Sequence, residues 1–369
     1  MISGDMGTWG GGRANYNPSM PMRSDASHRR RSLRARLPTI VVILAATAVA
    51  ASGCGSSSST DSTGETGGTD GTGETGGTAL EESLSRFRAD ESTRSYVEFG
   101  NASRIDELSG GTVDGTWGSL AGLGSGALFQ HRTELPDELA IHPSEAESAI
   151  TTGQPPAALT LLQGGQDGDE ITSAANDAGW TGDDVLTLDD LGTNPLAVTI
   201  PQIVPLAEDV AVGSAEADMS IVDTDGDTLA ADPLVSELAS CLGDVVGAGF
   251  AAAGDYPTSY GVRPDEDDPD TVIGIICVAP PSGEAERLAS DIEDAIASGE
   301  IPGSGQPYAD HFVQPDVEVL AGDSLENGDV NDEVVRVAVT QTEDSFAIEL
   351  FQLAAANELP GLESRLALN

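Results

Sequence analysis

Three acidic side chains alternate with small residues in one segment, Asp223-Thr-Asp225-Gly-Asp227. Alternating carboxylates beside a glycine turn are typical of calcium-binding loops, because Ca²⁺ prefers several oxygen ligands. Here the glycine comes early, and the glutamate that closes an EF-hand loop is missing. An ordinary Asp/Gly turn is the favoured interpretation. The alternative is a metal site at Asp223, Asp225 and Asp227, and no cofactor is predicted.

The chain contains three cysteines, Cys54, Cys241 and Cys277. If Cys54 carries the modification described below, an even pair is left, and an even pair in an oxidising compartment predicts a disulfide between Cys241 and Cys277. Both lie in apolar runs, where a reactive thiolate is disfavoured. Two buried free thiols and a catalytic thiol are the alternatives.

The histidines of the body form no zinc-binding pattern. His131 and His142 are separated by ten residues of an acidic, loop-like segment, which favours solvated side chains over a metal site. Asp310-His311 resembles half of a catalytic triad, but sequence neighbours rarely form one and no G-x-S-x-G motif occurs. Paired carboxylates for glycoside hydrolysis are too numerous for any one pair to be chosen.

The charge of the chain excludes several classes of protein. It has 62 Asp and Glu residues against 16 Lys and Arg, all of them Arg, for a formal net charge of −46. Without lysine there is no P-loop, no pyridoxal Schiff base and no S-x-x-K nucleophile. Phosphate binding needs clustered Lys and Arg, so nucleic acid is not expected as a partner.

The N-terminal region has the parts of an export signal. Seven of the 16 Arg precede residue 54, and an apolar stretch runs from Leu37 to Ala51. A membrane-spanning helix would need about 20 apolar residues, so this stretch is short and favours a secretory signal.

The following ASGC at 51–54 resembles a bacterial lipobox, which implies cleavage before Cys54 and acylation of its thiol. Ala51 departs from that pattern, which prefers a larger aliphatic residue. An uncleaved signal anchor is the alternative, and translation from Met22 would give a more ordinary signal.

The remaining chain divides into a tether and a body. We expect a signal peptide over 1–53, a disordered low-complexity tether over 54–80 and an extracytoplasmic α+β region over 81–369. The tether is rich in Gly, Ser, Thr and acids and has almost nothing apolar to bury. The body is long enough for one large domain or for two modules at about 81–230 and 231–369. Beyond residue 53 the chain holds 60 acids and 9 Arg, a formal charge of −51.

Two parts of the body show the same predicted order of elements. The first has a strand at 158–162, a helix at 169–178 and strands at 184–188 and 196–200. The second, offset by about 113 residues, has a strand at 271–279, a helix at 282–298 and strands at 317–321 and 333–340. Their periodicities predict an α+β fold of two β-α-β-β modules with largely antiparallel sheets. Chance recurrence of this common order is the alternative.

Further elements are predicted outside the two parts. They are a strand at 95–99, short helices near 104–108 and at 145–151, a buried helix over 234–253 and an exposed acidic loop at 263–270. The apolar run at 234–253 is about as long as a membrane-spanning helix. Glu237 and Asp244 interrupt it, which favours a core helix.

The signal, lipobox, tether and Cys-paired α+β body together resemble uncharacterised lipoproteins of high-GC actinobacteria. The segments TTGQPPAALTLLQG at 151–164 and SCLGDVVGAGF at 240–250 are similar to stretches of such proteins. The resemblance implies a location and no activity. We therefore expect a lipoprotein of the cell membrane, held by its lipid outside the cytoplasm, that is non-catalytic and binds an envelope protein or a small ligand. The alternative is a secreted hydrolase that uses Asp/Glu carboxylates, with or without a divalent cation; a structural spacer is a third interpretation.

Overall fold

The computed structural model describes residues 77–188, 192, 196–222, 226–252, 254–321, 333–342 and 345–362. They belong to one compact unit, Thr72–Asn369. The predicted signal peptide, most of the predicted tether, and Cys54 lie outside the described residues, as do Asp223 and Asp225.

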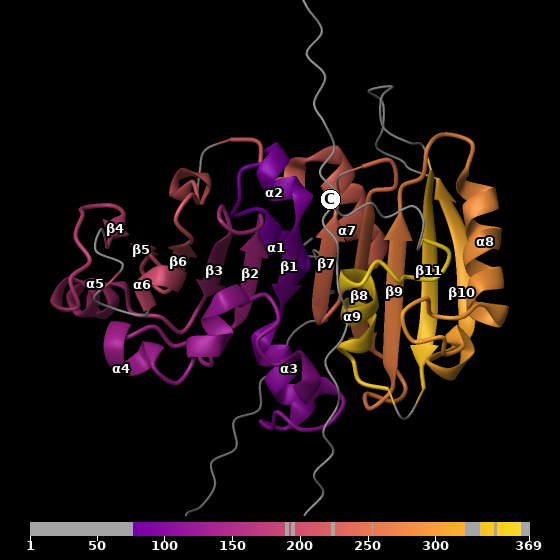
Figure 1. Cartoon of the computed structure of the whole chain (residues 1–369), viewed down its shortest axis with the longest axis horizontal. Coiled ribbons are helices and arrows are strands. Elements are labelled where there is room, and N and C mark those ends of the chain that lie inside the picture. The colour runs from indigo at the N-terminus through magenta and orange to yellow at the C-terminus, as the bar shows by residue number, and fades with distance from the viewer. Residues whose placement is uncertain are drawn as a thin grey trace, which may run out of the picture. The chain divides into compact units, whose positions relative to one another are not determined.

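Within the described residues, eleven strands form one antiparallel sheet in the order β10-β11-β9-β8-β7-β1-β2-β3-β6-β5-β4 (Figure 1). The strands are β1 (Val97–Gly100), β2 (Ser148–Thr152), β3 (Leu159–Gln163), β4 (Leu186–Thr187), β5 (Gln202–Pro205), β6 (Val210–Gly213), β7 (Gly247–Ala251), β8 (Thr258–Pro264), β9 (Val272–Val278), β10 (Phe312–Ala321) and β11 (Glu333–Gln341). The α+β class with antiparallel strands is confirmed.

The helices pack against this sheet. They are α1 (Ala79–Leu84), α2 (Glu91–Ser95), α3 (Ala102–Ser109), α4 (Leu135–Leu139), α5 (Gly168–Asp177), α6 (Leu196–Thr199), α7 (Pro233–Leu242), α8 (Ala285–Ser298) and α9 (Glu349–Ala355). Helices α5 and α7 begin after N-capping residues: the side chains of Asp167 and Asp232 accept backbone N–H groups of the first turns. In the described part of the chain, every helix is too short or too polar to cross a bilayer.

The strand pairing repeats in the two halves of the sheet. From the centre outward, one half runs β1-β2-β3-β6-β5 and the other runs β7-β8-β9-β11-β10. Helix α5 follows β3, and α8 follows β9 at the equivalent place. The predicted correspondence between 158–162 and 271–279 is therefore the correspondence of β3 with β9. Two further strands precede these in each half, β1 and β2 before β3, and β7 and β8 before β9. The strands that correspond to β10 and β11 are β5 and β6, and not the predicted strands at 184–188 and 196–200. The halves meet where β1 pairs antiparallel with β7.

Three predicted elements are wrong. The helix predicted over 145–151 is strand β2, which pairs with β1 and β3 on its two sides. The strand predicted at 196–200 is the short helix α6. The helix predicted over 234–253 ends at Leu242 before Gly243, which has a φ of +70°, and the chain then continues as β7. Short apolar runs have the same composition in a buried helix and a buried strand, so tertiary pairing decides between them.

Two layers of helices cover the two faces of the sheet. On one face, α1 and α7 pack onto an apolar cluster that includes Val97 and Phe99 of β1. On the other face, α8 and α9 cover the half from β7 to β11, and α4, α5 and α6 cover the opposite half (Figure 1). Side chains of a strand alternate between faces, so Glu98 lies on the second face, between these two covered regions.

The predicted disulfide between Cys241 and Cys277 is confirmed. It joins α7 to β9, with the two Cα atoms 6.2 Å apart, and both cysteines are buried. Arg336 of β11 donates from Nε to the Cys241 carbonyl oxygen at 3.1 Å, where a cation suits the C-terminal end of a helix. The bridge therefore fixes one end of α7 on the sheet.

Loss of the disulfide should lower the free energy of unfolding by about 4 kcal/mol, because it closes a loop with a sequence separation of 36. Urea denaturation of the oxidised protein and of Cys241→Ala/Cys277→Ala measures the difference. Reductant should lower the wild-type midpoint and leave that of the double variant unchanged. Equal midpoints for oxidised and reduced wild-type protein would contradict this expectation.

Candidate functional site

A row of polar and aromatic side chains crosses the central strands on the face opposite α7. Glu98 lies opposite Thr151 on one side and Gly249 on the other. Thr151 lies opposite Thr160, and Gly249 lies opposite Tyr260. Directly paired residues of neighbouring strands share a face of the sheet. We call Glu98, Thr151, Thr160 and Tyr260 the central row.

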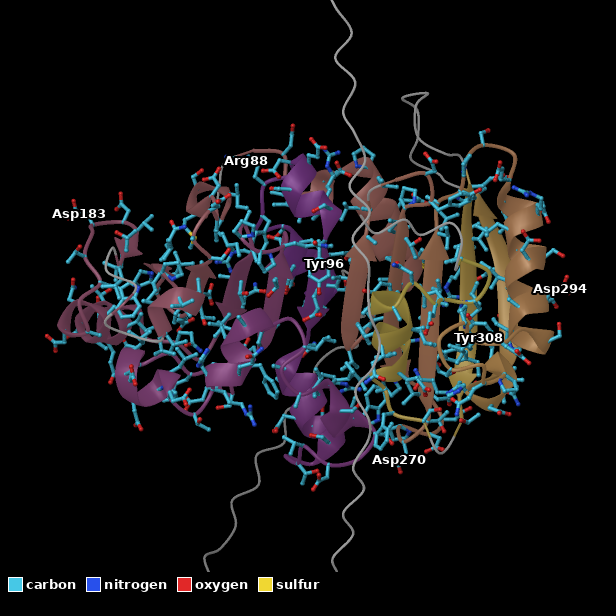
Figure 2. All side chains as sticks on the ribbon, in the orientation of Figure 1. Arg88, Tyr96, Asp183, Asp270, Asp294 and Tyr308 are labelled. Carbon is cyan, nitrogen blue, oxygen red and sulfur yellow. A yellow bond between two sulfur atoms is a disulfide. The ribbon has the colours of Figure 1, made fainter. Side chains whose placement is uncertain are left out.

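The carboxylate of Glu98 is held at both oxygens. Its Oε1 accepts the backbone N–H of Gly124 at 3.0 Å, and its Oε2 accepts the hydroxyl of Tyr96 at 2.9 Å. Figure 2 places Tyr96 over the middle of the sheet, far from Asp183 and Asp294. A carboxylate oxygen can accept more than one hydrogen bond, so Glu98 is a positioned acceptor with capacity for a ligand.

Gly124 connects two members of the central row through its backbone. Its N–H donates to Glu98, and its carbonyl oxygen accepts the Thr151 hydroxyl at 2.8 Å. The residue has a φ of +77°, and an added Cβ would collide with the Ala149 carbonyl oxygen. Only glycine fits this conformation and this close approach.

The two threonines of the row are hydrogen-bonded to each other. Their Oγ1 atoms are 2.7 Å apart, and both side chains are buried. A hydroxyl has one proton, and that of Thr151 goes to the Gly124 carbonyl oxygen. Thr160 is therefore the donor in the pair, and its own oxygen can accept a hydrogen bond from a ligand.

Tyr260 lies across strand β7. An added Cβ at Gly249 would collide with the Tyr260 ring, so the ring occupies the space above that glycine. The Tyr260 and Phe351 rings pack edge to face, with the ring centroids 5.4 Å apart and the planes at 72°. Burial raises the pKa of both Tyr96 and Tyr260, and the nearby charge of Glu98 raises each further. Both phenols are therefore neutral at physiological pH.

Two adjoining cavities lie over the central row, and together we call them the central cleft. The larger, of 530 Å³, is bordered by the segment before α4 and by α6, and all of its lining residues are uncharged. The smaller, of 220 Å³, is lined by Glu98, Tyr260 and Phe351 among others. Tyr96 and Gln154 line both cavities. Among the described residues, Glu98 is the one carboxylate in the lining.

A cavity of 630 Å³ elsewhere has a different character. It is lined by three arginines, Arg104, Arg263 and Arg336, together with four acidic residues. Arg336 donates to Glu318 at 2.9 Å, and Arg104 donates to Glu107 at 3.0 Å. Because two of these cations already have acidic partners and the lining mixes both signs of charge, the central cleft is the stronger candidate site.

The structure places the candidates from the sequence apart from the central cleft. Asp227, the described member of the candidate metal site, accepts the Ala89 N–H through its backbone carbonyl at 2.8 Å. Within the described part of the chain, no group of three His, Cys, Asp or Glu side chains could hold a metal ion. His142 contacts Glu145, and His311 contacts Glu349. His131 contacts Glu134 and lies behind the wall of the larger cavity, where its Nε2 is 3.4 Å from the hydroxyl of the lining residue Thr199. These histidines are separate from one another.

Sequence reasoning missed the central row. The signal that could have indicated it is Glu98, a single acid inside the strand-forming segment SYVEF. A charged residue is expensive in a central strand, which makes its presence there informative. Thr151, Thr160 and Tyr260 carry no such signal, because only the pairing of the strands brings them to Glu98.

No family model, no curated protein and no solved structure matches this chain.

Replacing Gly124 by alanine should lower the free energy of unfolding by about 2–4 kcal/mol, because positive φ and a backbone collision act together. Gly110→Ala is the matched control, since Gly110 has a φ of +63° and open space around it. That variant should lose only about 1 kcal/mol. Urea denaturation of both variants checks this, and equal losses would show that the collision is not significant.

The raised pKa values of Tyr96 and Tyr260 predict a loss of stability at alkaline pH. The folded state favours the neutral phenols, so this contribution is complete below the ordinary tyrosine pKa of about 10 and declines as the pH rises through it. Urea denaturation between about pH 9 and pH 11 should show a smaller decline for Tyr260→Phe than for the wild type. Identical declines would mean that Tyr260 ionises as easily in the folded chain as in the unfolded one.

Proposed function

We propose that the protein is a lipid-anchored lipoprotein of the cell envelope that binds a small molecule in the central cleft. The observation that carries the proposal is the 530 Å³ cavity with uncharged lining, in a chain with 62 acidic residues. Ligand sites are commonly clefts of about 300–1,000 Å³ with apolar walls and a few placed polar groups.

The lining of the larger cavity fits this description. Leu128, Val198 and Val212 supply apolar surface. Thr160 and Gln154 supply hydrogen-bonding groups beside it. A cleft between two separately packed apolar clusters can hold a ligand while the sheet beneath it stays rigid, because the sheet is covered on its far face by α1 and α7.

The geometry favours binding over hydrolysis. Glycoside hydrolysis uses two carboxyl groups about 5–10 Å apart on either side of the bond that breaks. Glu98 is the one carboxylate that lines the cleft among the described residues, and both of its oxygens already accept hydrogen bonds. The site thus offers positioned acceptors and aromatic surface, which suit recognition.

The sequence supports the location. Acylation of Cys54 would anchor the chain stably through two or more acyl chains. The acidic body would be repelled by anionic headgroups, and the predicted tether over 54–80 would let it stand away from the membrane.

Filling the larger cavity should abolish ligand binding. Ala158 lines this cavity, and the neighbouring Ala157 is exposed and does not line it, so Ala158→Phe and Ala157→Phe form a matched pair. Thermal-shift screening of a small-molecule library should yield compounds that raise the Tm of the wild type and of Ala157→Phe by several degrees at about 100 times Kd. They should not raise that of Ala158→Phe. Equal shifts in all three proteins would place the site elsewhere.

Anchoring should depend on Cys54. Mass spectrometry of the membrane fraction should find an N-terminal cysteine that carries a diacylglyceryl group and fatty acid. Cys54→Ser should lack the lipid and leave that fraction. An intact, unacylated N-terminus on the wild-type protein would contradict the proposed anchor without affecting the cleft.

A further inference from the structure

We infer that the central cleft recognises an organic cation, a primary amine or quaternary ammonium, whose charged head lies in the smaller cavity against Glu98. This inference rests on the proposed binding function and names the chemical class of its ligand. It is drawn from the charge balance of Glu98, from the aromatic lining and from the uncharged character of the adjoining cavity.

Glu98 is a half-buried carboxylate without a cationic partner among the described residues. Its two hydrogen bonds come from neutral donors, a backbone N–H and a phenol. Two other shielded carboxylates of the protein have an arginine: Asp209 pairs with Arg86 at 2.8 Å, and Asp232 pairs with Arg94 at 3.0 Å. Desolvating an unmatched carboxylate is unfavourable, so a ligand that covers Glu98 should supply a positive charge.

The walls around Glu98 are suited to such a charge. Tyr96, Tyr260 and Phe351 supply the aromatic rings that line the 220 Å³ cavity with it. Aromatic rings attract ammonium groups through their negative faces, and this attraction strengthens when water is excluded. An anion would be repelled both by Glu98 and by the net charge of the body, whereas a cation would be drawn toward them.

The larger cavity accounts for the rest of the ligand. Its lining carries no charge, and it joins the smaller cavity at Tyr96 and Gln154. Thr160 can accept a hydrogen bond there, beside the apolar side chains of Leu128 and Val212. The two cavities together fit a molecule with one ammonium head and an uncharged, partly apolar body.

Choline and 3,3-dimethylbutan-1-ol are the probes for this inference, because they share a shape and differ in charge. The Gly124 amide donates to Glu98, so its resonance in a ¹H–¹⁵N spectrum reports occupancy of the smaller cavity. Titration should give at least tenfold tighter binding of choline than of the alcohol, and choline binding should weaken as salt is added.

Glu98→Gln should weaken choline binding by about tenfold and leave the alcohol unchanged, a difference of about 1.4 kcal/mol for the cation alone. Glu107→Gln is the matched control, because it removes one exposed acid outside the cleft. Tyr260→Leu keeps Glu98 and should weaken choline binding by about fivefold. It serves as the second variant if Glu98→Gln is unstable.

The outcomes separate this inference from the proposed function. Equal binding of both probes, or equal effects of Glu98→Gln and Glu107→Gln, would overturn the cationic ligand. So would a neutral or anionic compound that shifts the Gly124 resonance more strongly than any amine or ammonium compound in the library. In that case small-molecule binding would stand. If no compound shifts the Gly124 resonance and Ala158→Phe changes nothing, both proposals fail.

Discussion

The antiparallel pairing of β1 with β7 is the interaction on which the rest of the structure depends. It joins two halves of related strand order, and its register sets Glu98 opposite Gly249. Because side chains alternate along a strand, that register also directs Val97 and Phe99 into the apolar cluster under α1 and α7. A shift by one residue would exchange the two faces and bury the carboxylate in that cluster.

The halves share a topology but differ in the side chains at equivalent positions. Glu98 of β1 and Gly249 of β7 hold equivalent places in the two halves. The same holds for Thr151 of β2 and Tyr260 of β8, and for Thr160 of β3 and Ile276 of β9. The first half thus contributes hydrogen-bonding groups to the central cleft. The second half contributes aromatic and apolar surface, and its glycine makes room for the Tyr260 ring. The smaller cavity therefore needs both halves, because Glu98 comes from the first and Tyr260 and Phe351 come from the second.

Charge shapes both the stability and the site of this protein. An excess of acids this large disfavours the compact state through repulsion among carboxylates. The disulfide between α7 and β9 and the buried core oppose that repulsion. Several arginines are committed to ion pairs, such as Arg86 with Asp209 and Arg94 with Asp232. The partners of Glu98 among the described residues are both neutral, a phenol and a backbone N–H.

The amino-acid sequence by itself determined the α+β class, the disulfide, the helices α5 and α8, and the correspondence of β3 with β9. Each of these depends on local periodicity, on caps or on counting cysteines, which are properties of short segments. Only the tertiary structure decided that 145–151 forms a strand, that 196–200 forms a helix, and that 234–253 divides into α7 and β7. The tertiary structure also creates the central cleft, because Glu98, Thr151 and Tyr260 are distant in the chain and are brought together by the register of the strands. Register is set by packing over the whole sheet, and no short segment contains that information.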